Sequence, residues 1–432
     1  MRYKTITPSL FIKNRKKLNK KIQPHSLVIV NANDEMPRTG DQFFPFRQNS
    51  DIFYLSGLDQ EKCILAICPD HPNKKYREII FTVKADQTMT TWLGHKYNKE
   101  EVKEISGVQT VMWLDDFEIT LRELMFHVDR VYLNQNEYVK FSPDVPSRDT
   151  RFSHEIRDKF PVHTYHRLAP LFIGLRLIKE PEEIALLQKA CDLTNDAFHR
   201  VLKFIRPGVM EYEVEAEMTH EFIRKGASGH AYLPIIGSGN NALVLHYTEN
   251  NNICKEGDLV LMDFGAEYAN YVADCTRTIP VNGKFTPRQR ECYEAVLRVQ
   301  KTATAFFVPG NTIDQINKKV NKLMEKEMIG LGLFSEEDVK KQNPEKPLYF
   351  NYLMHGVSHP IGLDVHDVGS KYIPFEKGMV FTLEPAIYIE KEGIGIRIEN
   401  DIMVDDTPVD LMKEIPREVG EIEALMGRGL KK

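Results

Sequence analysis

The sequence lacks a surplus of positive charge, a long hydrophobic run and any closely spaced pair of cysteines. Its 432 residues carry a formal net charge of -5, whereas nucleic-acid-binding proteins usually carry a basic surplus. No apolar stretch approaches the roughly 20 residues that a transmembrane helix needs. The six cysteines include no Cys-x-x-Cys pair, and a chain of this length does not depend on disulfide bonds. We therefore expect reduced thiols in a cytoplasmic protein.

A basic stretch near the N-terminus does not continue into the apolar core of a secretory signal. We expect an amphipathic helix there, with an apolar face made of Leu10, Phe11, Leu18 and Ile22. The whole chain has 42% hydrophobic and 28% charged residues, which is typical of a globular protein with a sizeable core.

The length of the chain favours two domains. Residues 26–134 alternate strand-like and helix-like segments, a pattern typical of an α/β domain with a mixed or parallel sheet. Within it, residues 102–125 are predicted to form a strand, a loop and a helix in that order. Buried strands are expected at Ser26–Ala32, Cys63–Pro69, Glu78–Lys84 and Val128–Asn134.

A proline-containing surface loop at residues 140–151 ends this part of the chain, and we place the boundary after it. The predicted domains are residues 1–170 and 171–432. Helices are expected in the second domain at Leu177–Ile205, Glu211–Gly226, Phe285–Phe307 and Thr312–Gly332. The Gly/Asn-rich segment at residues 236–242 lacks the lysine and spacing of a phosphate-binding loop, and residues 334–347 are predicted to be an exposed loop.

A compact histidine cluster marks the segment HGVSHPIGLDVHD. His355, His359 and His366 are three of the fourteen histidines and fall within twelve positions. Clustered imidazoles typically ligate metals, transfer protons or stabilise oxyanions. A histidine-rich surface loop without function is the alternative.

Two aspartates stand in the apolar segment LVLMDFGAEYANYVADCTRTIPV, which is predicted to be a β-hairpin. If the chain reverses at Tyr268–Ala269, Asp263 and Asp274 become cross-strand partners. Two carboxylates placed opposite each other repel, and burying them unpaired costs several kcal/mol. A cation bound between them would remove both costs, whereas a solvated strand face is the alternative without a ligand.

Two glutamates occur in the same kind of setting after the histidines. Glu384 ends the apolar run MVFTLE, and Glu399 follows Arg397 in GIGIRIE. Gly395 shares a strand face with Arg397 and Glu399, which predicts that another segment approaches the backbone closely there. An ion pair between Arg397 and Glu399 at a sheet edge is the structural alternative.

Four strand-borne carboxylates and one imidazole favour hard or borderline divalent ions, with Mn²⁺ more natural than a thiolate-bound Zn²⁺. Four carboxylates would give a single-metal site too much negative charge. Two metals that share bridging carboxylates would balance it, and such sites are common in hydrolases.

The ordered set Asp263, Asp274, His359, Glu384 and Glu399 resembles the five-ligand dinuclear signature of the pita-bread metallopeptidases. The surrounding segments MDFGAEYANYVADCTRT, HGVSHPIGLDVHDVG, EPAIYI and GIGIRIEND are close to those of the aminopeptidase P (Xaa-Pro aminopeptidase) group. FRQNSDIFYLSGLD is similar to the creatinase-like N-terminal domain of that group. The resemblance implies a creatinase-like α/β domain followed by a C-terminal pita-bread catalytic domain, an α/β (α+β) protein overall.

By this resemblance, Asp263 would ligate one metal, Asp274 and Glu399 would bridge two, and His359 with Glu384 would complete the second. Glu384 would also lie near the bridging water. The remaining residues that match the group's site are the substrate-side histidines His246, His355 and His366, the arginine Arg397 and the active-site tyrosine Tyr232.

The implied activity is release of the N-terminal residue from peptides with proline in the second position, by attack of a metal-bridging hydroxide. The implied cofactors are two divalent ions, Mn²⁺ ahead of Zn²⁺ or Co²⁺, and the implied assembly is a homodimer or homotetramer. Ala386 departs from the pattern, where a glycine usually follows Glu-Pro, and the linker from Glu384 to Glu399 is short. Both features are expected to affect the pocket without removing a functional group.

Three other functions stay open at this point. A prolidase would cut Xaa-Pro dipeptides with the same fold and site, and a methionine aminopeptidase would usually lack the N-terminal domain. A non-catalytic pita-bread binding module would typically have lost metal ligands, whereas all five are present here.

Overall fold

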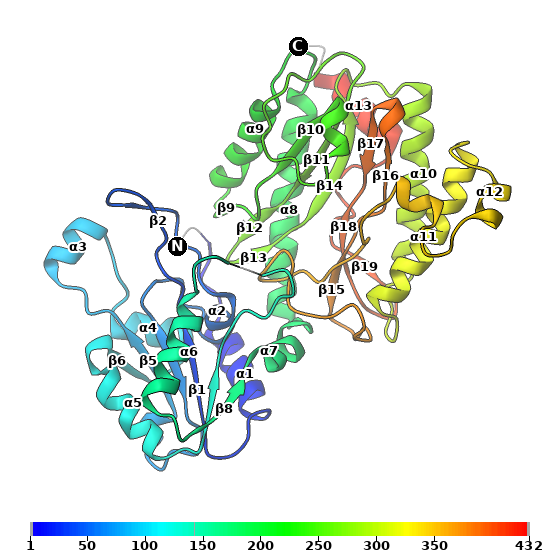
Figure 1. The fold of residues 1–432 in the computed structure, drawn as a ribbon. Coiled ribbons are helices and arrows are strands. Elements are labelled where there is room, and N and C mark those ends of the chain that lie inside the picture. The colour runs from blue at the N-terminus through cyan, green and yellow to red at the C-terminus, as the bar shows by residue number, and fades with distance from the viewer. Residues whose placement is uncertain (1–2, 142, 430–432) are drawn as a thin grey trace. The chain divides into compact units, whose positions relative to one another are not determined.

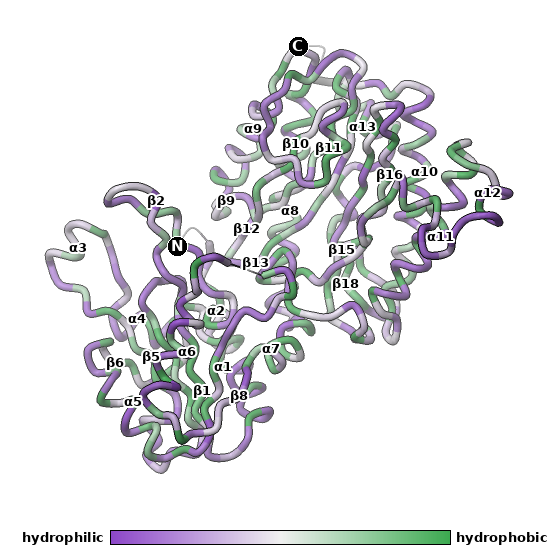
Figure 2. The backbone as a smooth tube through the Cα atoms, in the orientation of Figure 1, coloured by the Kyte–Doolittle hydropathy of each residue, from purple (hydrophilic) through white to green (hydrophobic). Residues whose placement is uncertain are grey.

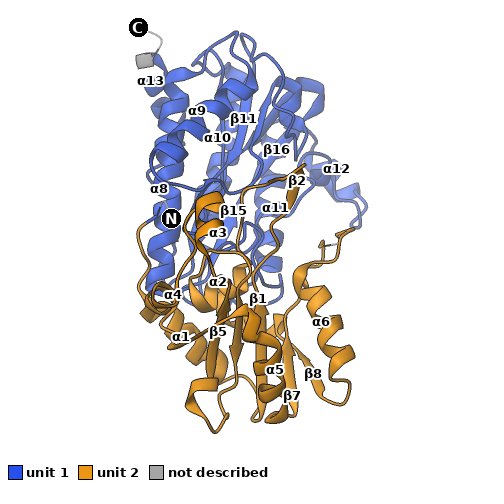
Figure 3. Cartoon of the chain, turned by 90° about the vertical axis from the view of Figure 1, so that its left-hand side faces the viewer, with its two compact units in different colours: residues 1–3, 177–432 blue, residues 4–176 orange. Residues whose placement is uncertain are grey.

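The computed structural model describes residues 3–141 and 143–429 (Figure 1). The chain forms two compact units (Figure 3). The N-terminal unit comprises Lys4–Arg176, and the C-terminal unit comprises Leu177–Lys432 together with the first three residues. Within the described ranges, no helix is both long and apolar enough to cross a membrane.

The N-terminal unit is built on a six-stranded mixed sheet in the order β6-β5-β4-β1-β7-β8. The central strand β1 is buried along its whole length because it pairs with β4 on one side and β7 on the other. Hydrophobic residues accordingly follow β1 and β5 in Figure 2. The strands are β1 (Ser26–Asn31), β2 (Pro37–Thr39), β3 (Gln42–Phe43), β4 (Ile64–Ile67), β5 (Glu78–Thr82), β6 (Thr110–Trp113), β7 (Arg130–Leu133) and β8 (Thr164–Arg167).

Helices flank this sheet, and the predicted N-terminal amphipathic helix is confirmed as α1, except that Ile22 of its predicted apolar face lies beyond the end of the helix and is half-buried. Leu10, Phe11 and Leu18 of α1 are buried. The helices are α1 (Pro8–Asn19), α2 (Ser50–Ser56), α3 (Gln87–Leu93), α4 (Lys99–Ser106), α5 (Phe117–Phe126), α6 (Arg148–Lys159) and α7 (Ala169–Arg176).

The strand predicted at the start of residues 102–125 is wrong, because that part of the chain belongs to helix α4. Asn98 and Glu101 form a capping box that satisfies the first amides of this helix, and Gly107 ends it with a left-handed φ of 73°. The strand comes after the helix, as β6, and the helix predicted at the end of the segment is α5.

The C-terminal unit holds several small antiparallel sheets, in the orders β10-β11-β14, β13-β12-β9, β15-β18-β19 and β16-β17. The strands are β9 (Gly229–His230), β10 (Ile235–Ser238), β11 (Leu259–Phe264), β12 (Ala266–Tyr268), β13 (Tyr271–Val272), β14 (Cys275–Pro280), β15 (Val380–Leu383), β16 (Ala386–Ile389), β17 (Ile394–Arg397), β18 (Asn400–Met403) and β19 (Val409–Asp410).

The four helices predicted for this unit are confirmed with small changes at their ends. The segment predicted as an exposed loop at residues 334–347 contains a short helix, α12, which Ser335 caps through a capping box with Asp338. The helices are α8 (Pro181–Phe204), α9 (Glu211–Arg224), α10 (Pro287–Thr304), α11 (Ile313–Gly330), α12 (Glu336–Lys341) and α13 (Val419–Gly429).

The hairpin that carries the two aspartates has a different register from the predicted one. Asp263 lies opposite Thr276, and Asp274 precedes β14 by one residue. The chain reverses at Ala269 and Asn270, whose φ angles of 53° and 63° form the turn, one residue later than predicted. Asp274 therefore lies diagonally across from Asp263 rather than directly opposite it.

A second hairpin carries the two glutamates and is interrupted in the middle. Strand β16 pairs with β17, whereas β15 pairs with β18, and both pairs follow one continuous register. The interruption falls where Glu384 and Pro385 stand opposite Glu399 and Ile398, and among the described residues a single backbone hydrogen bond crosses it, from the Ile398 amide to the Pro385 carbonyl at 3.3 Å. The close approach predicted at Gly395 is confirmed, because a Cβ there would lie 2.2 Å from the carbonyl oxygen of Ala242.

Candidate metal centre

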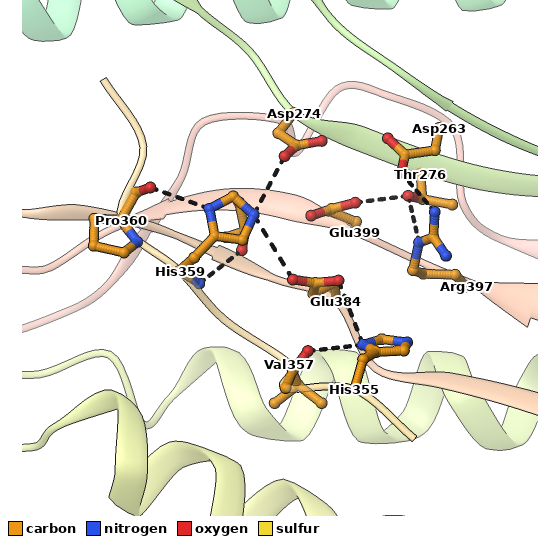
Figure 4. A network of polar contacts seen from close by, with 12 residues as sticks. Asp263, Asp274, Thr276, His355, Val357, His359, Pro360, Glu384, Arg397 and Glu399 are labelled. Atoms are coloured by element: carbon orange, nitrogen blue, oxygen red, sulfur yellow. Dashed lines mark hydrogen bonds and ion pairs between the residues drawn. The ribbon is translucent and has the colours of Figure 1, made fainter. Parts of the chain in front are cut away.

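The described structure brings the five predicted ligand residues into one buried cluster in the C-terminal unit (Figure 4). His359 Nε2 lies 3.4 Å from Asp274 Oδ2 and 3.8 Å from Glu384 Oε1. One ligand atom each from Asp274, His359 and Glu399 falls within 4.8 Å of the others. Three segments distant in sequence, which are the aspartate hairpin, the histidine segment and the glutamate hairpin, thus present polar groups to the same point.

Asp263 forms the other side of the cluster, next to an arginine. Arg397 Nη2 donates to Asp263 Oδ2 at 2.5 Å. The Tyr232 hydroxyl lies 2.6 Å from Asp263 Oδ1 and 2.5 Å from Asp274 Oδ1. A single hydroxyl proton therefore stands between two carboxylates that repel each other.

Two further side chains, Thr276 and Asp401, hold Glu399 and Asp274 in place by hydrogen bonds. The Thr276 hydroxyl donates to Glu399 Oε2 at 2.6 Å, and Arg397 Nε donates to the same hydroxyl oxygen at 2.9 Å. The amide of Asp274 donates to Asp401 Oδ2 at 3.2 Å. Asp401 is 1% exposed, so its carboxyl is itself a buried acidic group.

Buried carboxyl groups that repel one another dominate the electrostatics of the cluster. Burial and the neighbouring carboxylates raise the pKa of Glu399 well above its ordinary value. Burial raises the pKa of Glu384 to about 7, although His359 and Arg397 oppose the shift. Burial also raises the pKa of Asp263 to about 6 against the opposing charge of Arg397.

The same acids favour the protonated, positively charged form of His359. Burial alone would lower its pKa, but the contacts with Asp274 and Glu384 prevail and raise the pKa of His359 to about 9. Its Nδ1–H donates to the Pro360 carbonyl at 3.1 Å, so Nε2 is the nitrogen that faces the acids. Without another cation, a proton on Nε2 would supply the positive charge at that point.

This arrangement fits divalent metal ions. The groups facing the cluster are carboxylate oxygens and one imidazole nitrogen, a donor set that suits hard or borderline ions. The ring orientation of His359, fixed by a backbone carbonyl behind it, is the usual one for a metal-ligating histidine. Cations would also remove the repulsion that raises the pKa values of Glu384 and Glu399.

A hydrogen-bonded row beside the cluster joins His355, Tyr388 and Arg397. His355 Nδ1 lies 2.7 Å from the Gly356 carbonyl oxygen, which can only accept, so this nitrogen carries the proton. His355 Nε2 must then accept from the Tyr388 hydroxyl at 3.0 Å, while Arg397 Nη1 donates to the Tyr388 oxygen at 2.8 Å. Burial and the charge of Arg397 lower the pKa of His355 to about 4, so this imidazole is neutral.

The other two predicted histidines lie at the edge of the cluster and are exposed. The ring of His366 stands at 90° to that of His359, with 4.5 Å between their centroids. His246 follows the 3₁₀ helix η3 (Gly239–Leu243), and its charge contributes to the lowered pKa of His355. All ten predicted site residues thus lie in one part of the C-terminal unit.

Sequence reasoning missed Tyr388, Thr276 and Asp401. Thr276 and Asp401 alternate with a ligand residue in their segments, which is the signal that could have drawn attention to them. Tyr388 carries no comparable signal, because a tyrosine in an apolar strand such as β16 is usually a packing residue.

Comparison with known proteins agrees with this geometry. The pattern of the family described as Metallopeptidase family M24 matches residues 185–406, and that described as Aminopeptidase P, N-terminal domain matches residues 11–132. The Xaa-Pro aminopeptidase of Escherichia coli is 36% identical over 432 residues, covering 96% of this chain and 97% of that protein. The chain belongs to metallopeptidase family M24. The resemblance inferred from the sequence motifs is thereby confirmed.

Two further members extend the comparison. The Xaa-Pro aminopeptidase of Haemophilus influenzae is 35% identical over 429 residues, covering 96% of each chain. A solved structure of an Escherichia coli aminopeptidase P variant in complex with substrate has a TM-score of 0.89 at 34% identity, covering 99% of this chain and 100% of that chain. The predicted fold, a creatinase-like α/β domain followed by a pita-bread domain, is confirmed, and the chain is a metal-dependent hydrolase of this family.

Proposed function

We propose that the chain is an Xaa-Pro aminopeptidase, which releases the N-terminal residue from peptides with proline in the second position. The observation that carries the proposal is the convergence of Asp263, Asp274, His359, Glu384 and Glu399 on one buried point, in a chain whose full-length relatives include Xaa-Pro aminopeptidases.

The ligands divide between two divalent ions. Asp263 would hold one ion, Asp274 and Glu399 would touch both, and His359 with Glu384 would hold the other. The position of His359 beside Asp274 and Glu384, with Asp263 on the Arg397 side, supports this division. The oxygen-rich donor set supports Mn²⁺, with Zn²⁺ or Co²⁺ as alternatives that also accept an imidazole.

Bound ions of this kind polarise a substrate carbonyl and lower the pKa of water toward neutrality. Glu384 is suited to take up the water proton and pass it to the leaving nitrogen, because its carboxylate lies in the cluster beside His359 and can reach a water bound there. His355 is neutral and held by Tyr388, and Arg397 fixes both Asp263 and Tyr388. These contacts keep the acids and the imidazole oriented before a peptide arrives.

The exposed edge of the site supports a substrate-binding role for the histidines. His246 and His366 lie at the surface beside the buried cluster, where a peptide can reach them, and they can donate hydrogen bonds to its carbonyl groups. Tyr232 stands between two ligand carboxylates and is placed to contact a group bound there.

A dedicated enzyme for this bond has a physical reason. The peptide bond before proline has no N–H, so a peptidase pocket that binds this group gains nothing from it. Specificity must come from the proline ring and from the free N-terminal amine, both of which favour an exopeptidase with a confined site.

The deciding experiment compares an Xaa-Pro-Xaa tripeptide with the matching Xaa-Pro dipeptide, after metal removal and addition of Mn²⁺. We expect clear preference for the tripeptide. Preference for the dipeptide would make the chain a prolidase, and failure to cleave either peptide with metal bound would favour a non-catalytic binding module. An Asp274→Asn variant should lose activity with little unfolding.

The proposal includes a cytoplasmic homo-oligomer, a dimer or a tetramer. The six cysteines are free and buried, which supports a reducing compartment. Trp92 and Leu93 at the end of α3 are 82% and 63% exposed, and such apolar groups are typical of contacts between subunits. Sedimentation equilibrium of the wild type and of a Trp92→Ser variant would measure the assembly.

A further inference from the structure

A second group of metal-binding side chains lies in the N-terminal unit, apart from the site described above. It consists of His71, Glu123 and His127. Glu123 stands in the last part of α5 and His127 caps its C-terminus, one helical turn later. His71 belongs to the connection that follows strand β4.

The three side chains meet at a shared carboxylate oxygen. His127 Nε2 lies 3.3 Å from Glu123 Oε1, and His71 Nε2 lies 3.8 Å from the same atom. The two imidazole rings are 4.5 Å apart at an angle of 77°. One potential ligand atom from each residue falls within 4.8 Å of the other two.

The His71 imidazole is the observation that points to a ligand. Its side chain is 1% exposed, and its Nε2 has no hydrogen-bond partner among the described residues. The 3.8 Å separation from Glu123 is too long for a hydrogen bond. A buried polar nitrogen without a partner is costly, so the position requires an explanation.

The other nitrogen of His71 is held by the backbone. Nδ1 lies 3.1 Å from the carbonyl oxygen of Asn73, to which it can donate a proton, and 3.1 Å from the amide nitrogen of Asn73, from which it can accept one. In the tautomer with the proton on Nδ1, the lone pair of Nε2 points at Glu123 and His127. A metal-ligating histidine typically donates its second ring N–H to a carbonyl in this way.

We propose that His71, Glu123 and His127 bind one Zn²⁺ ion. Two neutral imidazoles and a carboxylate form a donor set that zinc accepts, with metal–ligand distances of about 2.0–2.2 Å that place tetrahedral ligand atoms about 3.4 Å apart. The pair of His127 and Glu123 already has this spacing, and His71 requires a small approach. A water molecule completes the coordination, because the Glu123 side chain is 49% exposed.

The position in the fold explains what the ion does. A cation at the C-terminal end of α5 interacts favourably with the helix dipole. The ion joins this helix end to the connection after β4, and strand β4 lies inside the six-stranded sheet. The site therefore stabilises the N-terminal unit and does not take part in peptide hydrolysis.

The test measures zinc content directly, in the full-length protein freed of metal and dialysed against buffered micromolar Zn²⁺. We expect the His127→Gln variant to hold one equivalent less than the wild type. The Asp274→Asn variant should retain this equivalent, because its change lies in the other unit. His95→Gln is the matched control, since His95 also pairs with a glutamate, Glu101 at 2.9 Å, but without a third ligand.

A second measurement covers the case in which His127→Gln fails to fold. The half-exposed Glu123 can be changed to glutamine with little effect on packing, and zinc-edge anomalous scattering from crystals of the wild type locates the ion. An anomalous peak between His71 and His127 that disappears in Glu123→Gln supports the site. The proposed zinc site is overturned if the wild type, His127→Gln and Glu123→Gln hold equal amounts of zinc, or if the wild type shows no anomalous peak at this position.

Discussion

Glu384 and Glu399 lie opposite each other in one hairpin register, at the point where the hydrogen bonds between the strands are interrupted. The amide of Glu384 donates instead to the Val357 carbonyl at 3.0 Å, and that of Glu399 donates to the Thr276 carbonyl at 3.1 Å. The interruption thus connects this hairpin to the histidine segment on one side and to the aspartate hairpin on the other.

The repulsion among the buried acids predicts that Glu399→Gln stabilises the metal-free protein. Since the pKa of Glu399 is raised on folding, its contribution to stability is full below the unfolded pKa and declines as pH rises through the acid range. Glutamine does not ionise, so the stability of the Glu399→Gln variant does not decline with pH in this way. The metal-free variant should therefore be more stable than the metal-free wild type at pH 7.5.

Calorimetry of both proteins with and without Mn²⁺ checks this prediction. The advantage of the variant should shrink toward pH 4, and Mn²⁺ should reverse the order because the wild type binds the ions more tightly. A metal-free variant that melts below the wild type at pH 7.5 would contradict the account of the site as an excess of buried acids.

Tyr388→Phe should lower kcat by about 10–100-fold with little change in KM. The phenol hydroxyl donates to His355 Nε2 and accepts from Arg397 Nη1, so its loss removes one hydrogen bond from each group beside the reacting atoms. Steady-state kinetics with Mn²⁺ measure the effect. Tyr349→Phe is the control, because the Tyr349 hydroxyl accepts a bond from Asn321 on α11, away from the cluster. A similar loss in both variants would argue against a specific role.

Gly265→Ala should destabilise the protein by at least about 3 kcal/mol or prevent folding. A Cβ at Gly265 would lie 1.7 Å from the Ala273 carbonyl oxygen, in the hairpin that carries Asp263 and Asp274. Gly420 in α13 has open space around the same position, so Gly420→Ala should leave the melting temperature unchanged or raise it. Thermal unfolding of both variants tests the difference.

The buried His230 is expected to make the folded protein less stable at acidic pH. Burial lowers the pKa of His230 to about 4, so the folded protein keeps this imidazole neutral while the unfolded chain binds a proton below about pH 6.5. Stability is therefore full above pH 6.5 and falls as the pH drops toward 4, by up to about 3 kcal/mol. In His230→Gln this dependence should flatten, as urea unfolding would show, whereas a change at the exposed His154 should leave it intact.

The clustering of the candidate ligands could be predicted because the four carboxylates break apolar strand patterns and His359 stands in a group of histidines. A carboxylate inside a strand such as β11 is expensive unless something pairs with it, and that cost is visible in the sequence. The register could not be predicted in the same way, because the turn depends on left-handed backbone at Ala269 and Asn270, which neither residue type signals strongly. The one-residue shift placed Thr276 opposite Asp263.

The supporting residues required the structure for a different reason. Tyr388 acts through contacts with His355 and Arg397 that join segments distant in sequence. The helix at Lys99–Ser106 was missed although its capping residues, Asn98 and Glu101, are present in the sequence, because the apolar residues within it are few.

The interrupted hairpin also has a consequence for hydrogen exchange. The amide of Glu399 is bonded to the Thr276 carbonyl of β14 and that of Glu384 to the Val357 carbonyl of the histidine segment, so neither can open without moving a buried segment of the unit. Deuterium should enter these two positions at the slow rate of global unfolding even after the metals are removed. The protein would then present its ligands in place before any ion binds, and metal exchange would proceed without refolding.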